Sequence, residues 1–355
     1  MRTIHIAASR SYDVLLDEGL LSRSGRLASH VLPPSRVMVI SDSTVSALFG
    51  GIVLDSFARA GYKAFSFTFE PGERSKTLAT LGGALNALAR AGFTRGDCVA
   101  ALGGGVVGDL AGFAAAVYAR GIPFLQLPTT LLAAVDSSIG GKTAVNLDAG
   151  KNLAGAFWQP SLTLCDTAVM RGLPAHLQAE GAAEMIKHAT LADPELFARL
   201  ANPDPAVRSD NLEDTLERNL MIKRALVQAD ERDKGVRQKL NLGHTIGHAV
   251  ETVSGHGYTH GQAVAIGLYR IARAAERMGY AGSGLSDSIR QVLTLTGLPY
   301  NCPLTADDLL TAARLDKKRD GSATTLVVPR GIGRCDLVKV DDEGLAEWFR
   351  AGSPD

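Results

Sequence analysis

The histidines of residues 241–260 are the residues of this chain best spaced to do chemistry. His244 and His248 lie four residues apart, and His260 follows at the start of another apolar segment. Positions i and i+4 share one face of an α-helix, so a helix here would place the first two imidazoles side by side. Imidazole is a common zinc ligand. The segment is therefore a candidate metal site, although such histidine pairs more often pack in a core or face solvent.

A catalytic zinc usually takes three protein ligands, often including one carboxylate, and keeps a fourth position open. Glu184 is the best candidate for that carboxylate. It is the acid of an otherwise small and apolar helical stretch, beside Lys187 and His188. We expect Glu184 to join the histidines, while the spacing alone leaves open which of them complete the set.

A glycine-rich segment suggests a second site, for a dinucleotide. The expected strand 97–102 runs into GGGVVGDLAG at residues 103–112. Glycines between a strand and a helix let the backbone approach a phosphate at the helix N-terminus. The pattern departs from GxGxxG, and such clusters also serve tight packing. An acid about twenty residues further on has no clear candidate, so Asp42, at the end of strand 36–41, is the expected ribose contact.

Residues 136–143 end in Gly-Lys-Thr like a nucleotide phosphate loop, but Asp136 stands where that loop requires glycine, so a nucleoside triphosphate site is excluded. Lys142 remains a candidate for binding another anion. Several further cations occur in uncharged or apolar neighbourhoods, where any one of them could also be a solvated side chain. As a set they favour a cleft for a multiply anionic small molecule: Arg120, Lys151, Lys187, Lys223 and Arg237.

The elements that must position these residues change character along the chain. Short apolar runs alternate with helical stretches at first, which predicts a mostly parallel sheet covered by helices. After Leu173-Pro174 the pattern is helical, apart from an expected hairpin of residues 323–328 and 335–340 before a last helix. The expected strands are 36–41, 63–69, 97–102, 124–127 and 162–165, and the expected helices are 175–200, 206–230, 240–252, 261–278 and 286–298.

Composition narrows the classes of partner. The chain has 355 residues, with 37 basic and 37 acidic side chains that are well mixed, which argues against nucleic acid or a membrane surface. The four cysteines form no CxxC pair, as is typical of buried thiols in a reducing compartment. The apolar run 110–119 is too short to span a bilayer. We expect a soluble cytoplasmic protein.

With these residues aligned, the chain closely resembles the 3-dehydroquinate synthase family over nearly its whole length. The segments that carry the resemblance are far more specific together than any one motif: GGGVVGDLAGFAAAVYARG at 103–121, LPTTLLAAVDSSIGGKTAVN at 127–146, KNLAGAFWQP at 151–160, EMIKH at 184–188 and NLGHTIGHAVE at 241–251.

The resemblance implies an α/β N-terminal Rossmann-like domain at residues 1–168 and an all-α C-terminal domain at 169–355, with the active site between them. It implies NAD and zinc, with cobalt as an alternative metal, a small anionic sugar-phosphate substrate and a homodimer. The implied reaction converts 3-deoxy-D-arabino-heptulosonate 7-phosphate to 3-dehydroquinate and phosphate in the shikimate pathway.

The same resemblance assigns roles residue by residue. The metal ligands fall on Glu184, His244 and His260. The resemblance therefore makes His248 a proton-transfer residue, and the i,i+4 pair His244 and His248 does not supply two metal ligands. The other catalytic positions are Lys142, Lys151, Asn152, Lys187 and Asp233. Substrate-binding positions are Asp136, Arg120, Lys223, Arg237, Asn241 and Lys317 or Lys318. NAD contacts fall on Asp42, Glu73, Lys76, Gly104, Gly105, Val106, Asp109, Thr129, Thr130, Val169 and Gly172, with Lys142 and Lys151 again.

Two positions depart from the family pattern. Gln262 stands where the family commonly has Glu after the ligand His-Gly, and Asp233 stands where it commonly has a Glu. The shorter reach of Asp233 weakens any proton-transfer role there. Three rival functions stay open: another NAD- and zinc-dependent cyclase of the valiolone or inosose type, a metal-dependent polyol dehydrogenase, and a nucleotide-sensing module without catalysis.

Overall fold

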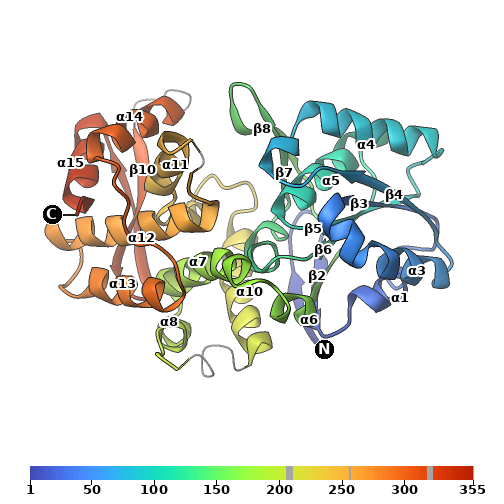
Figure 1. The fold of residues 1–355 in the computed structure, drawn as a ribbon, viewed down its shortest axis with the longest axis horizontal. Helices are drawn as coiled ribbons and strands as arrows, with labels where there is room; N and C mark the ends of the chain where they lie inside the picture. The colour runs from blue at the N-terminus through green and yellow to red at the C-terminus, as the bar shows by residue number, and fades with distance from the viewer. Residues whose placement is uncertain (205–210, 256, 318–322, 355) are drawn as a thin grey trace. The chain divides into compact units, whose positions relative to one another are not determined.

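The structure is a computed structural model that describes residues 1–204, 211–255, 257–317 and 323–354. The chain divides into two compact units, Met1–Pro174 and Ala175–Asp355, coloured blue to green and green to red in Figure 1. Each unit has its own core and is described separately below.

The first unit contains a seven-stranded sheet in the order β1-β2-β9-β6-β5-β3-β4. Its neighbouring strands are parallel except β1 and β2, which confirms the predicted mostly parallel sheet. The central strands β5, β6 and β9 are buried along their whole length, as expected for a sheet covered on both faces. The strands are β1 (Arg2–Ile6), β2 (Tyr12–Asp17), β3 (Arg36–Asp42), β4 (Lys63–Phe69), β5 (Cys98–Gly103), β6 (Phe124–Pro128) and β9 (Leu162–Asp166).

Helices cover both faces of this sheet, and alternate residues of β3 divide between them. Val37 and Val39 join the cluster that contains Phe57 of α3, whereas Met38 and Ile40 face the cluster of α4 and α5. This alternation follows from the two-residue period of a strand. The helices are α1 (Ser24–Ser29), α2 (Ser43–Val45), α3 (Gly51–Arg59), α4 (Leu78–Arg90), α5 (Gly105–Val117) and α6 (Thr167–Arg171).

A two-stranded hairpin, β7 (Lys142–Leu147) and β8 (Gly150–Phe157), stands outside the main sheet in the same unit. The hairpin is not predictable from the sequence pattern, because its strands are rich in Gly, Lys and Asn and lack a clear apolar alternation. Its strands approach closely at Gly155, where a Cβ atom would lie 2.2 Å from the carbonyl oxygen of Thr143. Figure 1 shows β8 extending away from the helices of this unit.

The second unit is built mainly from helices around α12 (His260–Arg277), which packs against α7, α11, α13 and α15. The predicted C-terminal hairpin is present as β10 (Thr324–Gly331) and β11 (Arg334–Val340), so this unit is helix-rich rather than purely helical. The other elements are α7 (Ala175–Ala192), α8 (Pro194–Leu200), α10 (Leu212–Ala229), η6 (Val236–Asn241), α11 (His244–Val253), α13 (Leu285–Leu295), α14 (Ala306–Lys317) and α15 (Asp342–Gly352).

The predicted helices of this unit differ in their bounds from the structure. The helix expected at 240–252 is α11, which begins only at His244, and two others differ more. The expected helix 175–200 is two helices, because Asp193 caps α8 by accepting from the N–H of Leu196 (3.0 Å) and Pro194 begins it. The expected helix 206–230 is described from Leu212 onward, since residues 205–210 lie outside the described residues. Helix α14 was not predicted. Among the described residues, no helix is both long and apolar enough to cross a membrane.

Candidate active site

Glu184 lies near the middle of α7 with its side chain fully buried. Burying a carboxylate is unfavourable unless an opposite charge or a metal compensates it. Lys187, one turn along the same helix and 1% exposed, forms an ion pair with Oε2 of Glu184. The other oxygen, Oε1, faces two imidazoles: its distance to Nε2 is 3.6 Å for His244 and 3.4 Å for His260.

The two imidazoles meet because their helices approach closely. His244 begins α11 and His260 begins α12. Gly243 adopts φ +78, and a Cβ on Gly267 of α12 would lie 2.0 Å from the carbonyl oxygen of Gly243. Glycine at both positions therefore permits the spacing that puts the rings of His244 and His260 5.4 Å apart.

The ligand-type atoms of Glu184, His244 and His260 all lie within 4.8 Å of one another, close enough for one ion to reach all three. Two imidazoles and one carboxylate form a ligand set suited to a catalytic zinc. His248 lies beside them, with its ring 5.4 Å from that of His244, but its residue is exposed. Ligand-type atoms of His248 and His260 also lie within 4.8 Å of each other, in a group with Glu251. The structure thus brings the four candidates Glu184, His244, His248 and His260 into one cluster.

The pKa values of His244 and His260, the two imidazoles nearest Glu184, are shifted in opposite directions. Burial, reinforced by the charge of Lys187, lowers the pKa of His244 to about 3, so its ring is neutral and able to bind a metal. Burial also acts to lower the pKa of His260, but hydrogen bonding to Glu184 and Glu251 outweighs it and raises that pKa to about 10. A cation bound between His260 and Glu184 would take over the role of that proton.

Two acids that were not among the predicted site residues lie beside this cluster. Glu251 of α11 lies with Oε1 3.6 Å from Nδ1 of His260, the ring nitrogen opposite the one that faces Glu184. Glu180, one turn before Glu184 on α7, accepts from the N–H of Gly261 (2.8 Å) and from the hydroxyl of Thr259. A carboxylate at a helix N-terminus is favourable. The i,i+4 spacing of Glu180 and Glu184 was the available sequence signal.

The departure at Gln262 has a structural explanation. Its side chain accepts from the N–H of Thr259 (3.1 Å), while the hydroxyl of Thr259 accepts from the backbone of Gln262, which forms a capping box. Gln and Glu serve equally in such a box. The substitution therefore preserves the N-terminus of α12 that presents His260.

Three of the predicted cations of this unit are buried: Lys187 is 1%, Lys223 5% and Arg237 2% exposed. Arg237 is held by Asp230, whose carboxylate accepts from the backbone of Lys234, Gly235 and Arg237, and these hydrogen bonds lower the pKa of Asp230.

Asn241, His244 and His248 line a hollow of about 200 Å³, so a candidate metal ligand and the candidate proton-transfer residue border the same cavity. Asp233 lies in the loop before η6 with φ +57, and Lys317 ends α14. Lys318, the alternative to Lys317, lies outside the described residues.

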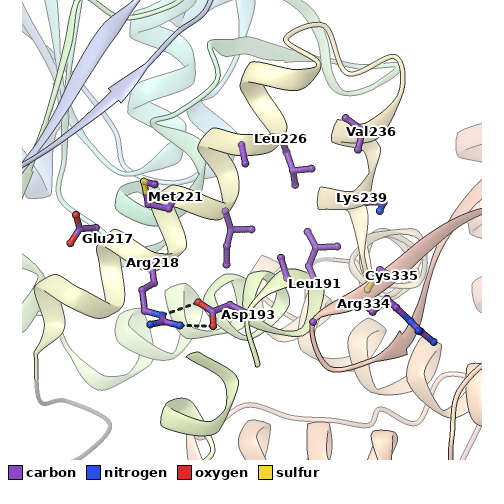
Figure 2. A pocket seen from close by; sticks show the side chains of 14 residues that line it. Leu191, Asp193, Glu217, Arg218, Met221, Leu226, Val236, Lys239, Arg334 and Cys335 are labelled. Carbon is purple, nitrogen blue, oxygen red and sulfur yellow. Dashed lines mark hydrogen bonds and ion pairs between the residues drawn. The ribbon is translucent and has the colours of Figure 1, made fainter. Parts of the chain in front are cut away.

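A larger hollow of about 680 Å³ in the same unit contains none of the predicted site residues. Figure 2 shows its walls, including Leu191, Met221, Leu226 and Val236, with the Asp193–Arg218 ion pair at one end. These walls are mostly apolar. Residues of α10, the helix that also carries Lys223, line this hollow, and among the described residues none of its lining side chains belongs to a group that could hold a metal ion.

In the first unit most of the predicted NAD residues lie where the parallel strands of the main sheet end. Parallel strands β3, β5, β6 and β9 bring their carboxyl ends together there, where ligands of such sheets bind. Asp42 ends β3, and its carboxylate accepts from the N–H of Val45 (2.9 Å). Gly104 separates β5 from the 13-residue helix α5 without any side-chain cap, which leaves the N-terminus open to an anion. Gly105, Val106 and Asp109 lie on α5, Thr129 and Thr130 follow β6, and Val169 and Gly172 lie at α6.

The predicted phosphate-binding residues of this unit lie mostly on the β7–β8 hairpin. Lys142 begins β7, and Lys151 and Asn152 lie on β8, all three exposed. Arg120 follows α5 with φ +69, and Asp136 lies in the helical turn η5 (Ala133–Ser137). These predicted residues thus lie at the ends of the sheet strands, on the hairpin or in the turns beside them, and Glu73 and Lys76 lie at the short helical turn Glu73–Ser75.

A parallel-sheet domain with a glycine-rich turn, joined to a helix-rich domain with a His-His-Glu cluster, is the architecture that the chain shares with solved sugar-phosphate cyclases. Models of the 3-dehydroquinate synthase N-terminal and C-terminal domains match residues 66–180 and 181–319. The chain is 40% identical over 343 residues to a 3-dehydroquinate synthase of Streptococcus gordonii, covering 96% of this chain and 97% of the relative. The chain belongs to the 3-dehydroquinate synthase family.

Solved structures of the class agree with this assignment. A 2-deoxy-scyllo-inosose synthase, complexed with carbaglucose-6-phosphate, NAD+ and Co2+, matches with a TM-score of 0.87 at 26% identity, covering 98% of this chain and 99% of that one. A 2-epi-5-epi-valiolone synthase from Streptomyces hygroscopicus, with NAD+ and Zn2+ bound, matches with a TM-score of 0.85 at 28% identity, covering 98% of both chains.

Proposed function

We propose that this chain converts 3-deoxy-D-arabino-heptulosonate 7-phosphate to 3-dehydroquinate and phosphate, as a cytoplasmic homodimer in the shikimate pathway. The observation that carries the proposal is the convergence of Oε1 of Glu184 with the Nε2 atoms of His244 and His260, beside the buried Lys187. We assign NAD binding to residues 1–168 and metal and substrate binding to residues 169–355.

Glu184, His244 and His260 would hold zinc, or cobalt in its place. When bound, the metal acts as a Lewis acid on a substrate oxygen, and NAD accepts and later returns a hydride. Asp42, the open N-terminus of α5 and Lys76 with Asp109 would hold NAD. The N-terminus of α5, which has no side-chain cap, suits its pyrophosphate.

The protein side chains then have two tasks, binding anions and moving protons. Lys142, Lys151 and Asn152 would hold the phosphate that leaves, and Arg120 and Asp136 would orient the sugar. Lys223, Arg237 and Asn241 would hold the substrate carboxylate, since two cations beside an amide suit a planar anion. His248, exposed at the mouth of the hollow, would transfer protons to and from the substrate, with Asp233 as a weaker participant because its carboxylate is short.

The direct test incubates the purified chain with the heptulosonate phosphate, NAD and zinc, and follows phosphate release together with dehydroquinate formation. The proposal expects both products in equal amounts, no net NADH at 340 nm, and no turnover without NAD. Net NADH formation would instead indicate a polyol dehydrogenase.

A second candidate function is that of the solved inosose and valiolone synthases, which the chain resembles. They differ in substrate, so a matched series should include a hexose 6-phosphate and a heptulose phosphate that lacks the carboxylate. Faster phosphate release from either of these than from the heptulosonate would overturn the proposed substrate. Lys223 and Arg237, both buried in the second unit, are the cations that we propose recognise the carboxylate that these two alternative substrates lack.

A further inference from the structure

A buried lysine of the first unit joins a residue of α5 to the tip of the β7–β8 hairpin. Lys76, just after η3 (Glu73–Ser75), is 4% exposed. Its Nζ donates to Oδ2 of Asp109 on α5 (2.6 Å) and to Oδ1 of Asn152 on β8 (2.5 Å). A buried ammonium needs such acceptors, so the position of Asn152 is tied to the charge of Lys76.

This contact selects which end of the Asn152 amide is presented to a ligand. The amide has one end that accepts, Oδ1, and one that donates, Nδ2, whereas a lysine ammonium only donates. The network therefore assigns Oδ1 to the side of Lys76. Nδ2 is then the end offered on the exposed hairpin, and a donor is what a phosphate oxygen requires.

A second set of hydrogen bonds fixes the backbone of the same residue. Asn152 has φ +56, and its N–H donates to Oδ1 of Asn146 on β7 (2.9 Å). Asn146 in turn donates from Nδ2 to Oε1 of Glu73 (2.7 Å) and from its backbone N–H to the carbonyl of Lys76 (2.8 Å). Segment 73–77 and the hairpin tip are thus fastened together at both side chains and backbone.

We propose that Lys76 is a positioning residue that orients Asn152 so that its amide donates to the phosphate group of the substrate. The inference rests on the proposed function, because that function places a phosphate at Asn152. It assigns Lys76 a task toward phosphate, separate from any contact with NAD.

A double-mutant cycle tests this with inorganic phosphate as the probe, its affinity for the NAD-loaded protein being measured by calorimetry. Loss of one hydrogen bond to a charged group corresponds to a weakening of roughly 10-fold or more, so Lys76→Met and Asn152→Ala should each show it. If Lys76 acts through Asn152, the variant with both changes should bind phosphate no more weakly than Asn152→Ala alone.

Losses that multiply in the double variant would overturn the inference, because Lys76 would then act on phosphate by its charge alone. Lys63→Met, which removes an exposed lysine of the same unit, is the matched control and should leave phosphate affinity unchanged. NADH titration by fluorescence completes the test: if Lys76→Met abolishes NAD binding while phosphate affinity is retained, Lys76 is a cofactor ligand only and the inference fails.

Asn146→Ala is a second route in case Lys76→Met fails to fold. This change removes the acceptor for the Asn152 N–H at a half-buried position and should weaken phosphate binding by roughly 3-fold to 10-fold. Combined with Asn152→Ala it should again give no further loss. A separate measurement tests the proposed function itself. If the unchanged protein releases no phosphate from the heptulosonate phosphate, the proposed function fails.

Discussion

The Nε2 atom of His260 lies 3.4 Å from Oε1 of Glu184, although 76 residues separate the two in the chain and they belong to different helices. Glu180 makes this approach possible, because its carboxylate holds the first residues of α12 against α7. The metal cluster therefore depends on helix packing as much as on the identity of the ligands.

Glu251→Gln should weaken zinc binding by roughly 10-fold to 100-fold without removing a ligand, because a carboxylate opposite the metal orients a histidine ring and raises its basicity. Competition with a chelator measures this change. Glu347→Gln, an exposed acid of α15, is the matched control. Unchanged zinc affinity in Glu251→Gln would show that Glu251 does not orient His260 for the metal.

Gly267→Ala should destabilise the second unit by about 1–3 kcal/mol, because the added Cβ would meet the carbonyl oxygen of Gly243 and force α11 away from α12. Chemical denaturation measures the free energy of unfolding. Gly282→Ala is the control, since no atom lies within 4 Å of its added Cβ. Equal stability of the two variants would contradict the close packing of these helices.

Asp97 should make the first unit sensitive to acid. Burial acts to raise its pKa, but hydrogen bonds from Arg36 and Thr94 outweigh it and lower the pKa below the ordinary value. A lowered folded-state pKa stabilises the protein above the unfolded pKa of about 4, and this contribution is lost as pH falls toward the folded pKa. Asp97→Asn should therefore show a smaller loss of unfolding free energy below about pH 4 than the parent does. If the unfolding free energy of Asp97→Asn fell with pH below about pH 4 as steeply as that of the parent, this role of Asp97 would be contradicted.

His248→Ala should lower turnover by roughly 100-fold, as expected when a general acid or base is lost. Because the side chain is exposed, the fold should be unchanged. Phosphate release under saturating substrate measures turnover, and circular dichroism checks the fold. Turnover within about twofold of the parent would exclude proton transfer by His248.

The sequence predicted much of the fold because its signals are local. The buried runs that became β5 and β6 and the glycine-rich turn before α5 are visible in short windows of sequence. The hairpin β7–β8 was not predicted, because polar strands such as GKNLAGAF show no apolar alternation. The division of the helix 175–200 was available from Asp193-Pro194, a cap followed by a residue that favours the first helical turn.

The candidate site was predictable to a similar extent. Glu184 stood out as an acid in an apolar stretch, and the structure places it with the histidines. The contact of Lys76 with Asn152 could not be predicted, because no local pattern links residues 76 positions apart. Likewise, the spacing of His244 and His248 could not show that the second ring would be exposed, because exposure depends on how α11 packs in three dimensions.

Zinc content per chain in His260→Ala and His248→Ala tests the central claim most directly. If Glu184, His244 and His260 hold the ion, dialysed His260→Ala should lose nearly all bound zinc, since a three-ligand site does not retain the ion on two. His248→Ala should keep about one zinc per chain. Full zinc occupancy in His260→Ala, or equal loss in both variants, would contradict the assigned ligand set.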